Sequence, residues 1–466
     1  MKTGIKFYNS VFAICIALSL SLCGQVKDET EKTGKAETRQ ESGSQKKDSK
    51  DSKDSKDSKD TKDTKDTKNS KDSKDTKDSK NSKDSKNSKN TKNTKDAKDS
   101  KNSKDAKDAK DSKDEKDSKD TKDETPVKVP RVSNSVLVAG DILLEADLLD
   151  FIDDFGKAYP VEKLRPVLSG YDIVFANLET PIGTHGKEAK DKPYVFMVNQ
   201  DYAEPIKRLS LNVVSIANNH IMDYGKEGLD STIDWLKENK IKYTGAGDNL
   251  NEARKPVIIN QKGIDFVFLA YNERPPESFY AKKDSPGTTY ADIKLITEDI
   301  KKYKTKANIV MVSLHWGIEQ TLYPQRYQIE LAHQIIDAGA DCVIGHHPHW
   351  IQGIEIYKKK PVFYSLGNLL NGFYNKVEQD NFVAVLRYKG LKLRRIEILP
   401  MAGKNSMTDF QPYLLTGDNA DEHLKLIKKI SDRFSTHFVI KNNTGYIYII
   451  DDEPNNIETR GRGQKP

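Results

Sequence analysis

Short apolar runs alternate with longer amphipathic stretches from about residue 129 onward. The apolar runs have the length expected of buried strands, and they lie at 136–139, 172–176, 213–217, 308–314 and 341–345. Helical periodicity separates them, most clearly at 228–238, 292–304 and 324–338. This alternation predicts an α/β fold whose fully apolar strands are covered on both faces.

Later runs indicate antiparallel strands as well. Residues 257–259 and 266–270 bracket Lys262-Gly263, a pattern that predicts a hairpin. Three further strand-like runs follow, at 362–366, 382–386 and 446–450. We therefore predict a layered α/β domain with mixed sheets over 129–404. A C-terminal extension over 405–466 would consist of a helix, a strand and a loose polar tail.

The first quarter of the chain lacks this pattern. Residues 24–128 consist largely of Lys-Asp-Ser, Lys-Asp-Thr and Lys-Asn-Ser triplets. So few apolar residues cannot offset the entropy of ordering, and we predict a long disordered tether. Lysine and aspartate nearly balance, which favours a simple spacer over a segment that grips an anionic polymer. About 100 flexible residues would have an r.m.s. span of roughly 50–60 Å.

Residues 1–23 have the features of an export signal. Lys2 and Lys6 precede an apolar run that ends in LSLSLC and is too short for a membrane span. Leu20-Ser21-Leu22-Cys23 resembles a bacterial lipobox, with Leu22 where a small residue is usual. We expect lipidation of Cys23, membrane attachment through that lipid, and a location in the cell envelope. A plain secretory signal is the alternative.

Charge and cysteine content narrow the range of functions. The formal net charge is only +6. The predicted domain has no basic stripe with interleaved aromatics, which argues against a nucleic-acid partner. Cys342 is the single cysteine of the predicted domain, so no disulfide framework can form inside it, and we expect it to pack as a small hydrophobe.

Side chains that can bind metals follow several of the apolar runs. After the strand that ends at Gly345, three of the chain's nine histidines follow at 346, 347 and 349. Because the carboxyl ends of parallel strands lie at one edge of a sheet, we expect these side chains to share one crevice. Carboxylates, a carboxamide and imidazoles suit Mn, Fe or Zn better than Ca or Mg. The candidates are Asp141, Glu179, Asn219 with His220, His315, and His347 with His349.

Two neighbouring segments have a less defined role. In 218–228, Asp223, Gly225 and Gly228 could shape an anion-binding loop at a helix start. A tight turn with an N-cap is the simpler interpretation, and Asp223 alone is more often a surface charge. Residues 365–368 follow a strand directly and could line the same crevice.

Seven segments occur in the order typical of one protein family. They are AGD at 139–141, ANLETPI at 176–182, ANNHIMDYGKEGL at 217–229, GAGDN at 245–249, HWGIE at 315–319, IDAGADCVIGHHPHWIQGIE at 336–355 and PVFYSLGNLL at 361–370. With these segments the chain resembles the CapA family of capsule or poly-γ-glutamate synthesis proteins, which have a calcineurin-like metallophosphatase fold. The resemblance covers roughly 135–370.

The resemblance implies a role for each candidate residue. It implies metal ligation by Asp141, Glu179, Asn219, His315, His347 and His349, with Glu179 as the bridging carboxylate. His220 would be a general acid, and Asp141 and His220 would form the catalytic pair. One or two divalent ions would clamp a phosphoryl or acyl oxygen. Two features depart from the family of folds: Leu143 replaces the histidine of the usual Asp-x-His, and Glu179 replaces an aspartate.

These observations predict an exported CapA-like protein with a divalent-metal hydrolase site. It would act in synthesis, export or anchoring of an anionic capsule polymer such as poly-γ-glutamate, and that polymer or its precursor would be its partner. The missing histidine supports an alternative, a non-catalytic metal-binding scaffold or polymer-binding lipoprotein. A metal-dependent phosphodiesterase acting on small phosphoesters is a third possibility. The sequence identifies no protein partner.

Overall fold

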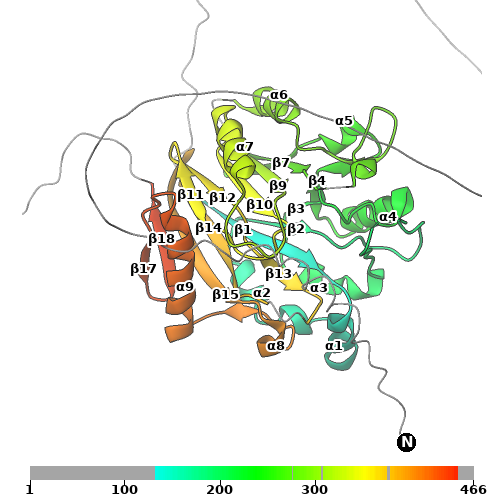
Figure 1. The fold of residues 1–466 in the computed structure, drawn as a ribbon, viewed down its shortest axis with the longest axis horizontal. Helices are drawn as coiled ribbons and strands as arrows, with labels where there is room; N and C mark the ends of the chain where they lie inside the picture. The colour runs from blue at the N-terminus through cyan, green and yellow to red at the C-terminus, as the bar shows by residue number, and fades with distance from the viewer. Residues whose placement is uncertain (1–131, 191, 275, 306–307, 375–377, 450–466) are drawn as a thin grey trace, which may run out of the picture. The chain divides into compact units, whose positions relative to one another are not determined.

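Two mixed β-sheets stack face to face at the centre of the molecule (Figure 1). The computed structural model describes residues 132–190, 192–274, 276–305, 308–374 and 378–449. The predicted export signal and tether lie outside these residues. Within them, no helix is long and apolar enough to cross a bilayer.

The first sheet has ten strands, and its central path runs β17-β18-β15-β14-β1-β2-β3-β4. Four neighbouring strands of this path are parallel, namely β1 (Ser133–Leu143), β2 (Ile173–Leu178), β3 (Val213–Ser215) and β4 (Lys242–Thr244). An antiparallel half continues from β1 through β14 (Asn381–Lys389), β15 (Lys392–Ala402), β18 (Thr444–Tyr448) and β17 (Val439–Lys441). Two short strands, β13 (Asn368–Asn371) and β16 (Tyr413–Leu414), pair with β1 and β15.

The second sheet has six strands in the order β11-β12-β10-β9-β7-β6. Its parallel centre consists of β12 (Lys360–Phe363), β10 (Cys342–His346), β9 (Asn308–His315) and β7 (Ile264–Asn272). The antiparallel edge strands are β11 (Ile354–Tyr357) and β6 (Val257–Gln261). The pairing of β6 with β7 confirms the predicted hairpin. A separate two-stranded ribbon joins β5 (Ala246–Gly247) and β8 (Gly287–Thr288).

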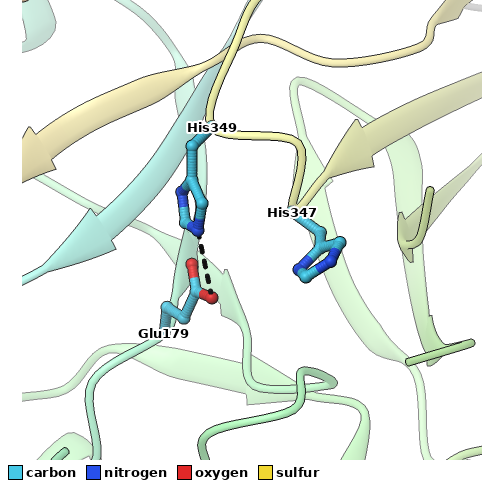
Figure 2. Close-up of side chains that lie close together, drawn as sticks. All are labelled: Glu179, His347 and His349. Atoms are coloured by element: carbon cyan, nitrogen blue, oxygen red, sulfur yellow. Dashed lines mark ion pairs between the residues drawn. The ribbon is translucent and has the colours of Figure 1, made fainter. Parts of the chain in front are cut away.

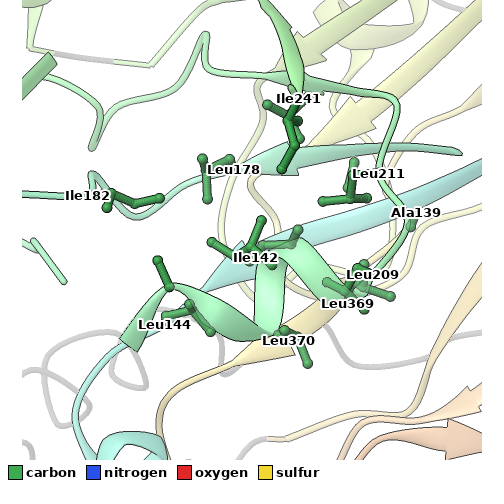
Figure 3. Packing of buried hydrophobic residues seen from close by; sticks show 14 of the residues in the cluster. Ala139, Ile142, Leu144, Leu178, Ile182, Leu209, Leu211, Ile241, Leu369 and Leu370 are labelled. Atoms are coloured by element: carbon green, nitrogen blue, oxygen red, sulfur yellow. The ribbon is translucent and has the colours of Figure 1, made fainter. Parts of the chain in front are cut away.

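Alternating side chains on the strands divide the core into layers. On β1, Val136 and Val138 face the second sheet, whereas Leu137 and Ala139 belong to a different cluster on the outer face. The outer cluster packs helices against the first sheet, and Figure 3 shows part of it around Ile142 and Leu178. A third cluster packs helices against the far face of the second sheet. The layered α/β fold with mixed sheets is therefore confirmed, in the order helices, sheet, sheet, helices.

The helices cover these faces according to their apolar stripes. The first sheet carries α1 (Asp147–Phe155), α2 (Arg165–Leu168), α3 (Glu204–Arg208) and α4 (Gly225–Glu238) on its outer face. The second sheet carries α6 (Ile293–Tyr303) and α7 (Arg326–Asp337). The others are α5 (Leu250–Ala253), α8 (Asn405–Thr408) and α9 (Gly417–Asp432), and α9 adds Leu424 and Ile427 to the cluster between the sheets.

The C-terminal part is continuous with the first sheet. Strand β18 pairs with β15, and α9 packs beside them (Figure 1). The sequence pattern predicted the helix and the last strand but not β15. That strand begins with exposed and half-buried residues around Arg394 and Arg395, and only its second half is buried. Its pairing with β14 and β18 is what makes it a strand.

Candidate metal centre

The carboxyl ends of the parallel strands of both sheets bring the candidate residues together, and we refer to this cluster of side chains as the crevice. In the first sheet, Asp141 on β1 is level with Asn177 on β2. In the second sheet, His315 on β9 is level with His346 on β10. The predicted ligands therefore converge from five strand ends, those of β1, β2, β3, β9 and β10, as the sequence pattern suggested. Asp141, Glu179 and His315 are almost completely buried, and His347 is 3% exposed.

A close approach of two loops holds Asp141 in place. The backbone N–H of Asp141 donates to the carbonyl oxygen of Gly367 at 3.0 Å. A Cβ atom on Gly140 would lie only 1.9 Å from that same oxygen. Only glycine therefore permits this contact, and it joins segment 139–141 to segment 365–368. The side-chain oxygen Oδ1 of Asn368, the next residue, accepts a hydrogen bond from His349 Nδ1 at 2.9 Å, so this segment does line the crevice.

Two overlapping groups of side chains could each hold a divalent ion. One consists of Glu179, His347 and His349, which Figure 2 shows turned toward one another. The other consists of Asp141, Glu179 and His315, and in each group the ligand atoms all lie within 4.8 Å of one another. Glu179 belongs to both groups. Its Oε1 atom lies 3.5 Å from His315 Nε2 and 3.9 Å from His349 Nε2.

The hydrogen bonding of the crevice tests whether these residues suit a cation. Both carboxylate oxygens of Glu179 are buried and have no hydrogen-bond partner among the described residues, and the same holds for His347 Nδ1. Unsatisfied buried polar atoms are rare because each one costs free energy. A carboxylate with two free oxygens beside imidazoles is a donor set of the kind that borderline divalent metals prefer. The residues therefore fit such an ion.

The surroundings shift the pKa values of the two carboxylates in opposite directions. Burial raises the pKa of Glu179 to about 8, and the nearby charge of Asp141 adds to this effect although His349 opposes it. Burial also acts to raise the pKa of Asp141. Hydrogen bonding and positive charge from His346, His349 and the His347 N–H outweigh it and hold the pKa of Asp141 below its ordinary value. Asn177 Nδ2 also donates to Asp141 Oδ1, at 2.9 Å.

The pKa values of the imidazoles are also shifted in opposite directions. Burial, reinforced by the other histidines, holds the pKa of His315 and of His347 well below the ordinary value, so both rings are neutral and suited to ligation. Burial acts to lower the pKa of His349 as well. The carboxylates of Glu179 and Asp141 prevail and raise the pKa of His349 to about 9. In the metal-free site, His349 thus provides the positive charge that a cation would supply.

The backbone around the histidine pair is strained. His347 has a φ of 92° and His349 a φ of 56°, both in the left-handed region that non-glycine residues rarely adopt. Strain of this kind persists where the surrounding structure enforces it, most often at functional sites. The conformation turns both imidazoles toward Glu179 (Figure 2).

Asn219 and His220 lie at the side of the crevice formed by the first sheet. Asn219 Oδ1 accepts from His315 Nε2 at 2.8 Å, so this amide already contacts one of the candidate ligands. His220 Nδ1 lies 2.7 Å from Asp223 Oδ2. Because a carboxylate only accepts, Nδ1 carries the proton, which leaves Nε2 for exchange with a substrate. Burial holds the pKa of His220 below its ordinary value, although Asp223 opposes this.

Sequence reasoning misjudged Asp223. The predicted N-cap and surface charge are wrong, because Asp223 is completely buried and α4 has Tyr224 as its N-cap without a side-chain capping bond. Its carboxylate instead contacts His220 and the ammonium of Lys192, and it accepts from the backbone N–H of Phe196 at 2.8 Å. The ring of Phe196 packs on His220 with centroids 4.4 Å apart.

Two further residues of the site were not identified from the sequence. His346 Nδ1 lies 3.1 Å from Asp141 Oδ1, and His346 Nε2 forms no hydrogen bond with any residue that the structure describes. The histidine cluster at 346–349 was the available signal, but His346 was not assigned a role in the site. Lys192 lies in the long loop after β2, well beyond the end of that strand. Nothing in the local pattern could have placed its side chain against Asp223.

A family comparison matches the part of the chain that builds the crevice. The family model described as bacterial capsule synthesis protein PGA_cap matches residues 135–373, more than half of the chain. The match includes all six candidate metal ligands and His220.

Individual relatives agree with the family match. The chain is 34% identical over 253 residues to the PGA biosynthesis protein CapA of Bacillus subtilis, covering 53% of this chain and 66% of that protein. It is 31% identical over 243 residues to the capsule biosynthesis protein CapA of Bacillus anthracis, covering 51% and 59%. A probable polyglutamine synthesis accessory protein of Mycobacterium tuberculosis is 31% identical over 229 residues, covering 46% and 60%. The chain thus spans slightly less than two thirds of the length of each.

Among solved structures, the NAD nucleotidase NadN of Haemophilus influenzae matches at a TM-score of 0.36 with 14% identity. The alignment covers 64% of this chain and 63% of that one.

Proposed function

This chain belongs to the bacterial capsule synthesis protein family, and on that basis we propose that it acts in the synthesis, export or anchoring of an anionic capsule polymer. We propose poly-γ-glutamate or its precursor as the substrate class, export with a lipid anchor on Cys23 as the location, and the crevice as a divalent-metal hydrolase site. The observation that carries the hydrolase proposal is the pair of ligand groups sharing Glu179, with the proton-bearing His220 beside them.

The ligand groups define where metal would be held. Glu179, His347 and His349 would hold one ion, and Asp141, Glu179 and His315 would hold a second. Asn219 is placed to join the second group through the oxygen that now accepts from His315. A bound divalent ion would supply Lewis-acid chemistry toward a carbonyl or phosphoryl oxygen of the substrate.

His220 supplies the proton chemistry in this proposal. Asp223 fixes its tautomer through Nδ1, so the unprotonated Nε2 would take a proton from the attacking water and pass it to the leaving amine or alcohol. Lys192 contacts Asp223 and the carbonyl oxygen of Asn219, and Phe196 packs on the ring. These contacts hold the imidazole in one orientation, which is what positioned acid catalysis requires.

Binding without turnover is a second candidate function, and one observation favours it. Leu143 occupies the position of the histidine in the usual Asp-x-His, and its side chain is only 5% exposed. It therefore belongs to the core and cannot be a ligand. A site with one fewer imidazole could still hold metal and grip a polymer, as a scaffold protein would.

The His220→Gln variant separates the candidates. We expect metal-loaded full-length protein in detergent to cleave γ-linked glutamate oligomers, and His220→Gln to lower turnover by roughly 10²–10⁴-fold at unchanged metal content. His185→Gln, at an exposed histidine, is the matched control. Cleavage of a generic phosphodiester alone would indicate a phosphodiesterase. Metal without turnover of either substrate, together with polymer binding that survives in His220→Gln, would establish the scaffold instead.

A further inference from the structure

Strand β7 also ends near the crevice. It is followed by Arg274, whose positive charge is incompletely paired. Arg274 follows β7 by two residues, and Asn272 at the end of β7 is level with His315 on β9. The backbone N–H of Glu273 donates to the carbonyl oxygen of His315 at 2.9 Å. Arg274 is thus bound to the same edge of the second sheet as the candidate ligands.

The backbone at Arg274 is held from both sides. Its N–H donates to Asn272 Oδ1 at 2.9 Å, and Asn272 Nδ2 donates back to its carbonyl oxygen at 3.1 Å. The hydroxyl of Tyr280 lies 3.0 Å from the same carbonyl oxygen. Because these contacts already order the backbone at Arg274, the backbone would lose little further conformational entropy when the side chain binds a ligand.

The guanidinium has few partners for its five donors. Arg274 Nε is buried and, within the part of the chain that the structure describes, has no hydrogen-bond partner. Nη1 lies 3.4 Å from Glu273 Oε2, a long contact, and that oxygen also accepts from the hydroxyl of Tyr327 at 3.0 Å. The side chain is 27% exposed, so one face of the group remains open to a ligand. Guanidinium groups bind carboxylates and phosphates in bidentate geometry.

A second cation lies near the candidate ligands. Lys192, from the loop after β2, is only 8% exposed and contacts the buried Asp223. The charges of Arg274 and Lys192 both help to lower the pKa of His347, after the larger effects of burial and of His349. Lys192 already has short contacts with Asp223 and with the carbonyl oxygen of Asn219, whereas the contact of Arg274 with Glu273 is long.

We propose that Arg274 binds an anionic group of the substrate, a carboxylate or a phosphate, and so determines the specificity of the crevice. This inference rests on the proposed function, because it identifies the class of molecule that the metal site acts on. Glu273 would hold the guanidinium in place while the crevice is empty and would compete with the incoming anion.

The test measures anion binding directly and needs no turnover. Inorganic phosphate and γ-glutamyl-glutamate are titrated calorimetrically into Mn²⁺-loaded full-length protein, its Arg274→Gln and Arg274→Lys variants, and Arg165→Gln as a control at an exposed arginine of α2. We expect Arg274→Gln to weaken binding of at least one anion by about tenfold or more, Arg274→Lys to weaken it less, and Arg165→Gln to leave it unchanged. The anion that is affected identifies the source of the recognised group.

A variant that is expected to bind the anion more tightly serves as a control, because misfolding could explain only a loss of binding. Glu273→Gln removes the competing carboxylate, so we expect tighter binding of the same anion. The proposal would be overturned if each anion bound with the same affinity to the parent, to Arg274→Gln and to Glu273→Gln at equal metal content. Absence of bound metal or of hydrolysis in the parent would instead count against the proposed function. The same anion titrations on the metal-free parent and variants would then still test the role of Arg274.

Discussion

The residue that decides the chemistry of the crevice is Glu179. Its carboxylate is completely buried, and neither oxygen has a hydrogen-bond partner in the described ranges of the chain. Removing a carboxylate from water without a partner costs several kcal/mol, so proteins usually keep such a group only where something else compensates it. His349 compensates part of the charge at 3.9 Å, and a metal ion would compensate the rest.

Glu179→Gln tests this directly through stability. The pKa of Glu179 is about 8, so at pH 9 in EDTA the parent carries a buried charge that the variant lacks. We expect the variant to be more stable by about 1–2 kcal/mol under those conditions. With excess Mn²⁺ we expect the order to reverse, because metal binding stabilises the parent. Urea unfolding under both conditions measures this, and a parent that is the more stable in EDTA would contradict it.

The predicted ligands were accessible from the sequence because each follows an apolar run. Asp141, His315 and His347 needed only the rule that parallel strands end at one edge. Lys192 and Asp223 were not accessible in this way. They are 31 residues apart in the sequence and contact each other in the fold. The loops that carry them follow the packing of α4 and β2, which no local sequence pattern predicts.

At the scale of elements, Asp172 connects three strands far from the crevice. Just before β2, its carboxylate accepts from the N–H and hydroxyl of Ser135 on β1 at 2.9 and 2.8 Å. It also accepts from Gln261 and from Lys262, in the hairpin between β6 and β7, at 3.0 and 2.7 Å. It thus links the two sheets at the end opposite the strand ends that form the site.

This cluster makes stability depend on pH in a defined direction. Burial acts to raise the pKa of Asp172, but the bonds from Lys262, Ser135 and Gln261 lower it to about 2. A lowered pKa means that the stabilisation is complete above the unfolded value of about 4 and is lost as pH falls toward 2. We expect Asp172→Asn to cost about 1–2 kcal/mol at pH 7, and the difference from the parent to shrink between pH 4 and 2.

Chemical unfolding across that pH range checks the prediction. Asp234→Asn is the matched control, because Asp234 is exposed and pairs only with Lys237 on the surface of α4. We expect the control to cost less than about 0.5 kcal/mol. A constant difference between Asp172→Asn and the parent from pH 7 to 2 would show that the carboxylate's charge is not what stabilises the contact.

At the scale of the whole molecule, the crevice exists because two sheets stack with their strand ends in line. Sequence reasoning predicted mixed sheets but could not assign strands to one sheet or the other. Runs such as 172–176 and 308–314 are apolar on both faces, so they carry no signal of which neighbour they pack against. Phe175 on β2 stacks on Phe268 on β7 at 5.4 Å between centroids, a contact that only the folded arrangement defines.

The central claim is that this crevice holds a divalent metal, and metal content tests it most directly. Full-length protein is purified without chelator and analysed by inductively coupled plasma mass spectrometry beside the His347→Ala, His349→Ala double variant. We predict about one or two equivalents of Mn, Fe or Zn in the parent and loss of at least one equivalent in the variant. A folded parent that binds none of these metals even after reconstitution would contradict the account.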